Sequence, residues 1–179
     1  VCSSDLSSTS VLMNEDRTLS AAFSLNSYEL TISPGVGGSV EGNGTYEYGS
    51  FASISASPDA GYSFAGWSGT GLSDPFSANT TVSMSEDRNL SASFVLNSYD
   101  LLLLAEPGGT VTGSDTYEHG SSASISAKPN QGYFFNGWSG EGITDPSSSS
   151  TSVLMNEDLT LSAAFSRSEE HTSELQSPC

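Results

Sequence analysis

Cysteine and basic residues are scarce in this sequence, and each scarcity argues against a class of protein. The two cysteines stand at opposite ends, as Cys2 and Cys179, so neither a disulfide framework nor a thiolate metal site is expected between them. Four Lys and Arg residues stand against 21 Asp and Glu, giving a formal net charge of −17. Such a chain repels phosphate backbones and anionic lipids, so we predict no nucleic-acid partner.

Long apolar runs are missing as well. The longest, Leu101–Ala105, falls far short of the roughly 20 residues that cross a bilayer, so no membrane insertion is predicted. Neither end has the layout of a secretion signal. Hydrophobic residues make up 35% of the chain, which is lean for one large core and favours small modules.

The two ends read as foreign to the rest of the chain. Residues 1–6 and 167–179 can each be encoded by adapters of short-read sequencing libraries, so we interpret them as translated adapter sequence. Both cysteines lie in these ends. The segment between them is cysteine-free, and we interpret it as an internal fragment of a longer reading frame.

The chain consists of repeats. Residues 25–95 align without a gap to residues 96–166, at a period of about 71 residues. Residues 7–23 match the end of the second copy except at Arg17. We therefore predict two complete repeats, preceded in residues 7–24 by the C-terminal hairpin of a truncated one.

Within each repeat the hydrophobic period is two, which predicts strands; Tyr28, Leu30 and Ile32, for example, alternate with other residues. Asn43-Gly44 favours a tight hairpin, and residues 85–89 resemble the tip of another. The predicted fold class is mainly β, in tandem small modules of five or six short strands. Each module is expected to be either β-grasp-like or a small β-sandwich.

The motif "GWSG" surrounds both Trp67 and Trp138. It lacks the basic residue and the following helix of a phosphate-binding loop. It also departs from a nucleophile elbow, because Thr70 occupies the place of the last glycine. His119 replaces Tyr48 of the other copy, so the two repeats share no catalytic base. We predict no catalytic residue and no enzyme activity.

Acidic residues recur at matching positions, as in Glu86-Asp87 and in the Asp-Pro pair that begins at Asp74. They do not form the Asp-x-Asp-x-Asp-Gly run of a calcium loop. Paired catalytic carboxylates would need a cleft that the sequence does not indicate. We interpret these residues as solvated turns, with weak ion binding as the open alternative, and predict no metal site and no cofactor.

The segments "GTYEYGS", "ASPDAGYSFAGW" and "LSASF", in this order, resemble the divergent internalin-type B-repeat. The resemblance covers essentially all of residues 7–166. It implies a compact β-rich module without catalytic residues, found in tandem in large secreted and surface-anchored bacterial proteins. The implied location is extracellular or at the cell surface, and the implied role is that of a spacer or adhesive unit.

A module of this size needs a few large side chains in its core, and the two tryptophans are its natural centres. The open alternative is an exposed tryptophan that stacks on sugar rings, as Trp67 and Trp138 could do, so exposure of the rings discriminates between the two. The predicted core residues are Tyr28, Ile54, Tyr62, Phe64, Trp67, Phe94, Tyr99, Ile125, Tyr133, Phe135, Trp138 and Phe165.

Two functional classes remain. The first is a non-enzymatic spacer or adhesion segment, whose partners are neighbouring repeats of the same chain and a glycan or a host or cell-surface protein. The second is an array of carbohydrate-binding modules appended to an extracellular enzyme.

The connection between the complete repeats is short. Phe94 and Tyr99 are core candidates of successive repeats, so the array should be semi-rigid. Leu102, Leu104 and Phe134 replace polar residues of the first copy, and their strand parity directs them away from the predicted core. We therefore expect this second face to pack on a neighbouring repeat.

Removing residues 1–6 and 167–179 should leave the melting temperature unchanged, because adapter-derived residues have no part in the fold. Thermal unfolding of the trimmed and full chains, followed by circular dichroism, checks this. A large loss of stability, or a native disulfide between Cys2 and Cys179, would contradict the interpretation.

Overall fold

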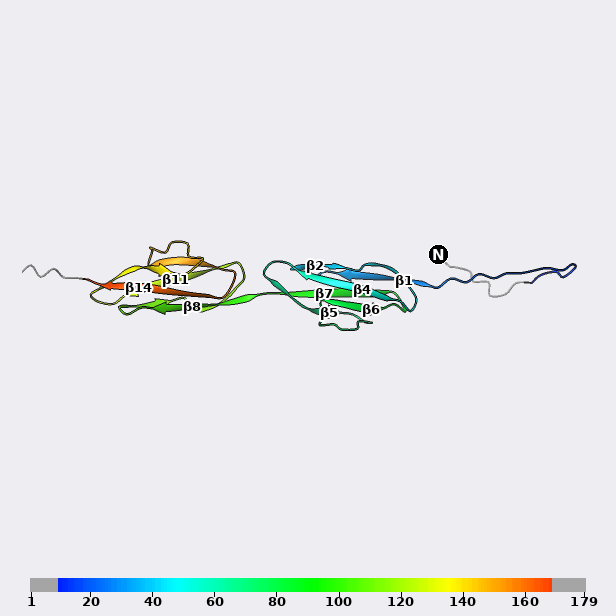
Figure 1. Cartoon of the computed structure of the whole chain (residues 1–179), viewed down its shortest axis with the longest axis horizontal. Helices are drawn as coiled ribbons and strands as arrows, with labels where there is room; N and C mark the ends of the chain where they lie inside the picture. Colours follow the sequence, from blue (N-terminus) through cyan, green and yellow to red (C-terminus); the bar gives the residue numbers. More distant parts are fainter. Residues whose placement is uncertain (1–9, 169–179) are drawn as a thin grey trace, which may run out of the picture.

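The computed structural model describes residues 10–168, and all of the regular structure in this range is β. Two modules lie end to end along one axis (Figure 1). Module 1 comprises β1 (Ser27–Ser33), β2 (Gly38–Glu41), β3 (Gly44–Glu47), β4 (Phe51–Pro58), β5 (Tyr62–Ser68), β6 (Asn79–Ser83) and β7 (Arg88–Leu96). Module 2 comprises β8 (Ser98–Ala105), β9 (Gly109–Thr112), β10 (Asp115–Glu118), β11 (Ser121–Pro129), β12 (Tyr133–Ser139), β13 (Ser150–Met155) and β14 (Leu159–Arg167).

Each module is a two-layer sandwich. In module 1 a four-stranded sheet with the order β3-β1-β7-β5 packs against a three-stranded sheet with the order β2-β4-β6. Module 2 repeats both sheets, as β10-β8-β14-β12 and β9-β11-β13. The predicted mainly-β class is confirmed, in its sandwich form, because the described range contains no helix of the kind that a β-grasp requires. For the same reason it contains no helix able to cross a membrane.

Seven strands form in each module where five or six were expected. The additional strands are short: β2 and β3 have four residues each. Four residues give too little alternation for a clear strand pattern, which explains why the sequence did not separate them.

Successive strands never pair with each other. The chain crosses from one sheet of the sandwich to the other at every connection from β1 to β7. The two predicted hairpins are therefore wrong, because β2 and β3 lie in different sheets, and so do β6 and β7. Asn43 instead lies where the chain crosses from β2 to β3. Its side-chain oxygen accepts the amide of Ile32 at 2.5 Å, just beyond Leu30 and Gly44, the last pair of the β1–β3 ladder.

This connectivity also explains residues 10–24, which form no strand. Their counterparts in module 2 are β13 and β14, which lie in different sheets and pair with strands from the rest of the module. Without such partners Phe23 is 95% exposed, whereas its counterpart Phe165 is 8% exposed. The segment forms no ladder in the described residues, and it extends away from module 1 (Figure 1).

Each module has its own core between its two sheets, and most of the predicted core residues lie there. Five of them are buried, namely Ile54, Trp67, Ile125, Trp138 and Phe165. Five more are half-buried and pack against the cores, namely Tyr28, Phe64, Phe94, Tyr99 and Phe135.

Tyr62 and Tyr133 require a correction, because neither belongs to a core cluster. Tyr133 is 37% exposed. The first residue of β5 and of β12 lies at the end of the sandwich, where the tyrosine ring covers a glycine of the β1–β2 or β8–β9 connection. A Cβ on Gly37 would lie 2.2 Å from the Tyr62 ring, and a Cβ on Gly108 2.3 Å from the Tyr133 ring.

One boundary at the C-terminus also differs from the expectation. Arg167 pairs with Tyr133 as the last residue of β14, and the amide of Ser168 donates to the carbonyl of Gly132 at 2.7 Å. The strand thus continues into the adapter-like segment, because a backbone ladder accepts any residue other than proline. Residues 1–6 and 169–179, including both cysteines, lie outside the described residues.

Candidate functional site

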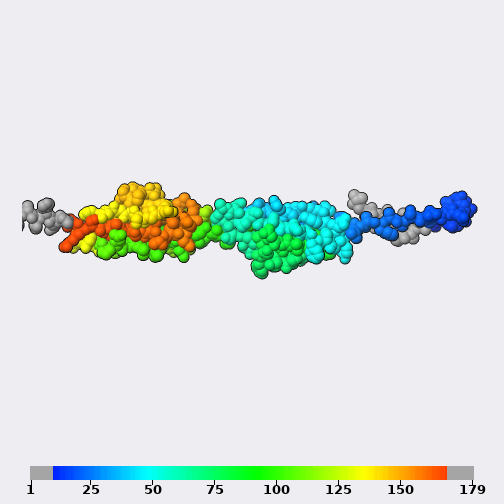
Figure 2. Space-filling model, viewed as in Figure 1, coloured from blue at the N-terminus to red at the C-terminus, as the bar shows by residue number. Residues whose placement is uncertain are grey.

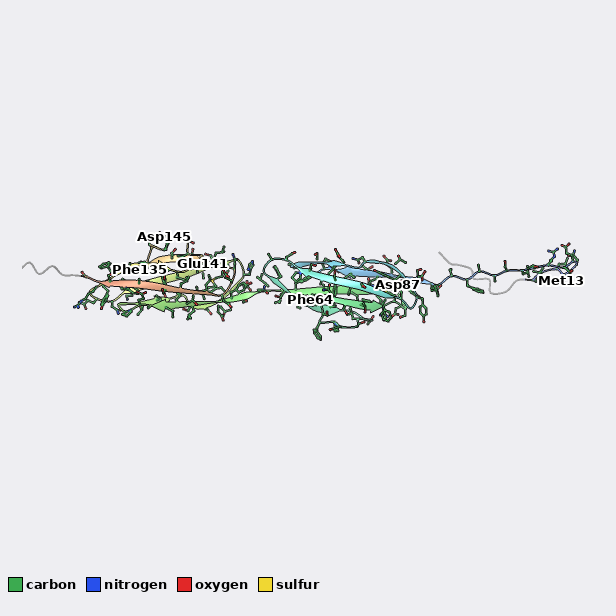
Figure 3. The ribbon with its side chains drawn as sticks, viewed as in Figure 1. Met13, Phe64, Asp87, Phe135, Glu141 and Asp145 are labelled. Atoms are coloured by element: carbon green, nitrogen blue, oxygen red, sulfur yellow. The ribbon has the colours of Figure 1, made fainter. Side chains whose placement is uncertain are left out.

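Trp67 lies near the end of β5, and the loop between β5 and β6 folds back over it. Its ring nitrogen donates to the carbonyl of Ser77 at 3.0 Å, and its amide donates to the carbonyl of Pro75 at 2.8 Å. Phe64 packs against the indole with a centroid separation of 5.5 Å. Figure 3 shows Phe64 on the ribbon of module 1 and its counterpart Phe135 at the corresponding place in module 2.

Trp138 repeats the arrangement. Its ring nitrogen donates to Ser148 at 3.1 Å and its amide to Pro146 at 2.8 Å. Both indoles are only 6% exposed. A sugar needs an open aromatic face for stacking, so the burial of Trp67 and Trp138 supports their predicted place in the core over the open alternative of glycan stacking.

Glycine is required two residues after the tryptophan. Gly69 has a φ of 127°, and a Cβ there would lie 2.2 Å from a side-chain carbon of Leu90. Gly140 stands in the same relation to Leu161, also at 2.2 Å. The "GWSG" motif is therefore a tight exit from β5 and β12 that lets the following loop cover the indole.

The serine of the motif has no catalytic partner. The hydroxyl of Ser68 hydrogen-bonds that of Ser91 at 2.8 Å, and the hydroxyl of Ser139 bonds that of Ser162 at 2.7 Å. A hydroxyl is not the base that activates a serine nucleophile. These pairs link β5 to β7 and β12 to β14 on the outer surface of the four-stranded sheets.

The repeated Glu-Asp pairs have a structural role. A carboxylate oxygen of Asp87 accepts the backbone amide of Glu29 at 2.8 Å, and Asp158 accepts the amide of Asp100 at 2.9 Å. Each aspartate precedes the last strand of its module and binds the first strand. It therefore joins the two strands at the end where the module begins, as Figure 3 shows for Asp87.

The Asp-Pro pairs shape the loop over the tryptophan. Asp74 accepts the amide of Phe76 at 2.9 Å. Asp145 accepts both the hydroxyl and the amide of Ser147, at 2.7 and 2.9 Å, and these bonds lower the pKa of Asp145 below its ordinary value. Within residues 10–168 no three potential metal-ligating side chains gather at one place.

A second arrangement lies between the modules, where Asn97 is the single residue that separates β7 from β8. Its amide donates to the carbonyl of Gly61 at 2.8 Å, and its side-chain oxygen accepts the hydroxyl of Ser63 at 2.6 Å. Its carbonyl accepts the amide of His119 at 2.8 Å. The linker is thus bonded to both modules, which restricts its backbone.

The ring of His119 lies directly on the backbone of Gly61, where a Cβ would be 1.9 Å from the imidazole. Its other neighbour is Tyr99, with a centroid separation of 6.0 Å. Nδ1 of His119 is buried and has no hydrogen-bond partner, so packing holds the ring in place. We call this contact of Asn97, His119 and Gly61 the joint.

Residues 28–98 and 99–169 each match the family of divergent InlB B-repeat domains. The chain belongs to this family. The two matches fall on the two modules, so one B-repeat corresponds to one sandwich. No curated protein and no solved structure shows significant similarity to the chain.

The expected contact between B-repeats was assigned to the wrong face. Leu102, Leu104 and Phe134 point away from the core, and each remains about half exposed, at 51, 49 and 51%. The joint forms at the end of the sandwich because a one-residue linker leaves no slack to bring the outer face of one sheet onto its neighbour. Sequence reasoning missed His119 in this role, although an aromatic or imidazole ring follows "TYE" in both copies.

Trp67→Ala should destabilise the first B-repeat by about 3–5 kcal/mol, because it removes a buried indole and leaves a cavity. Urea unfolding followed by the remaining fluorescence and by circular dichroism measures the loss. The second B-repeat should unfold at its wild-type midpoint, and Ser68→Ala should have little effect. Wild-type stability of the Trp67→Ala protein would contradict the role of core anchor.

Gly61→Ala and Gly132→Ala provide a matched pair that tests the joint. The two glycines have φ values of 81° and 80°, so both substitutions carry a similar backbone strain of about 1–2 kcal/mol. Only Gly61 has a ring above it, because a Cβ on Gly132 would meet nothing within 4 Å. Gly61→Ala should therefore change the relative orientation of the B-repeats in residual dipolar couplings, while Gly132→Ala leaves it unchanged. Equal effects of the two substitutions would show that the joint does not set the orientation.

Proposed function

We propose that this chain is a non-enzymatic spacer and adhesion segment of a large bacterial secreted or cell-surface protein, with neighbouring repeats as its partners within the chain. The observation that carries the proposal is the path of the backbone. Because β1 and β7 are parallel, the chain enters each B-repeat at one end and leaves at the other. With a single residue between β7 and β8, every repeat adds its length to the array (Figures 1 and 2).

The charge of the chain supports an extended segment. With 21 acidic and four basic residues, neighbouring modules repel each other except at their direct contact. Repulsion of this kind disfavours folding back of one module onto the next. It also keeps a repetitive β chain soluble, where like strands would otherwise associate.

Exposed loops support the adhesive part of the proposal. The loops over the tryptophans project from opposite sides of the two modules (Figure 2). Phe76 lies on the first of these loops and is 82% exposed, whereas Ser147 occupies the same position in the second. Successive repeats therefore present loops of different chemistry to a glycan or protein on a facing surface.

The carbohydrate-binding alternative has less support. The stacking platform that it required is buried, with both indoles at 6% exposure. A groove of about 500 Å³ crosses β2, β4 and β6 and offers hydroxyl and amide groups, but no aromatic face. Its lining residues are Glu41, Gly42, Ser53, Ile54, Ser55, Asn79, Thr80 and Thr81.

Adding B-repeats should lengthen the chain by a constant increment. Ser27 to Leu30 spans three residue steps, Leu30 lies opposite Arg88, and Arg88 to Ser98 spans ten more. At about 3.3 Å per residue the increment is about 40 Å per repeat. Small-angle X-ray scattering of chains with two, four and six repeats measures it through the maximum dimension. Increments well below this value would show that the repeats fold back, and retention of the chain on immobilised polysaccharide would favour the alternative.

A further inference from the structure

The first and last strands of each B-repeat are neighbours in the middle of the four-stranded sheet. In module 1 the parallel pair β1–β7 extends from Leu30 opposite Arg88 to Ser33 opposite Ser91. In module 2 the pair β8–β14 is one residue longer, from Leu101 opposite Leu159 to Ala105 opposite Ala163. We call these parallel pairs the terminal strand pairs.

Tension along the array acts on these pairs in one particular direction. It pulls the start of β1 toward the preceding part of the chain and the end of β7 toward the following part. Because the strands are parallel, these pulls are opposed and run along the strand axes. All hydrogen bonds between the two strands are then strained together, whereas a pull on the same end of both strands would break them one after another.

Additional bonds lengthen each terminal strand pair at both ends. At the entry end the carboxylate of Asp87 accepts the amide of Glu29 at 2.8 Å. At the other end the amide of Gly35 donates to the carbonyl of Ala92 at 2.9 Å. Module 2 repeats both contacts, with Asp158 binding Asp100 at 2.9 Å and the amide of Glu106 donating to Ala163 at 3.0 Å.

We propose that the B-repeat is a tension-resisting module, in which the terminal strand pair is the element that must shear before the module unfolds. The inference rests on the proposed spacer function, since a spacer between two surfaces is pulled at its ends. In this proposal, Asp87 and Asp158 extend the terminal strand pair that must shear. The continuous run from β7 through Asn97 to β8 places successive pairs in series.

Pulling a single molecule in two directions tests the proposal. End-to-end tension is applied through the thiols of Cys2 and Cys179. This protein also carries Glu86→Ser, so that both pulling directions are measured without the Glu86 carboxylate. For the second direction, Cys179→Ser and Glu86→Cys place the handles at Cys2 and at residue 86, in the turn before β7. The side chain of Glu86 is 69% exposed, so a thiol there is accessible. This geometry peels β7 from β1 at their common end.

The end-to-end experiment should give two unfolding events, each at a force several-fold higher than the single event of the peeling geometry, because the rate of forced unfolding depends on the direction in which the barrier is loaded. Equal forces in the two directions, or higher forces on peeling, would overturn the proposal. Such a result would leave the constant increment in scattering unaffected, so failure of the terminal strand pair and failure of the spacer are distinguishable.

Asp87→Ala locates the resistance within the module. It should lower the force of one end-to-end event and leave the other unchanged, because only module 1 loses its additional bond. Asp74→Ala is the matched control, since Asp74 also accepts one backbone amide, that of Phe76 at 2.9 Å, but in a loop outside the terminal strand pair. An equal loss of force in both variants, with equal urea midpoints, would overturn the assignment.

Discussion

The structure depends on one constraint, namely that each strand is followed in the chain by a strand of the opposite sheet. No strand therefore finds its hydrogen-bonding partner next to it in sequence, and β1 is completed only when β3 and β7 are both in place. The sandwich closes when β7 inserts between β1 and β5. Such non-local pairing is typical of domains that fold slowly for their size, so we expect each B-repeat to fold slowly and as one cooperative unit. Residues 10–24, which contain the corner without its partners, accordingly form no strand.

The same constraint explains why Trp67 lies beneath the loop between β5 and β6. The crossing from β5 to β6 is the longest connection of the module and has no sheet of its own to support it. Trp67 accordingly bonds the loop twice, through its indole nitrogen to Ser77 and through its backbone amide to Pro75, while its ring fills the core. Gly69 and Asp74 then shape the turns of this crossing.

Sequence reasoning identified the features that depend on local pattern and on side-chain size. Alternation predicted the strands and the outward direction of Leu102 and Leu104, and size predicted the buried indole. The hairpins failed because Asn-Gly favours a tight turn whether it stays in one sheet or crosses to another. The joint was missed because it is a contact between Gly61 and His119. The sequence shows that a glycine is present, but it does not indicate which side chain packs against it.

Two properties of the array reside in different parts of the module. Tension passes through the covalent backbone from β7 to β8, so the strength of each repeat is set inside the sandwich by its parallel strands. At the end of the sandwich, the three bonds of Asn97 and the ring of His119 join the two modules, and we expect these contacts to set the orientation of one B-repeat relative to the next. Substitution of His119, whose counterpart in the first repeat is Tyr48, can therefore alter the angle between repeats without weakening either repeat. This separation allows one scaffold to vary its loops and its joints while keeping the terminal strand pair that closes every copy.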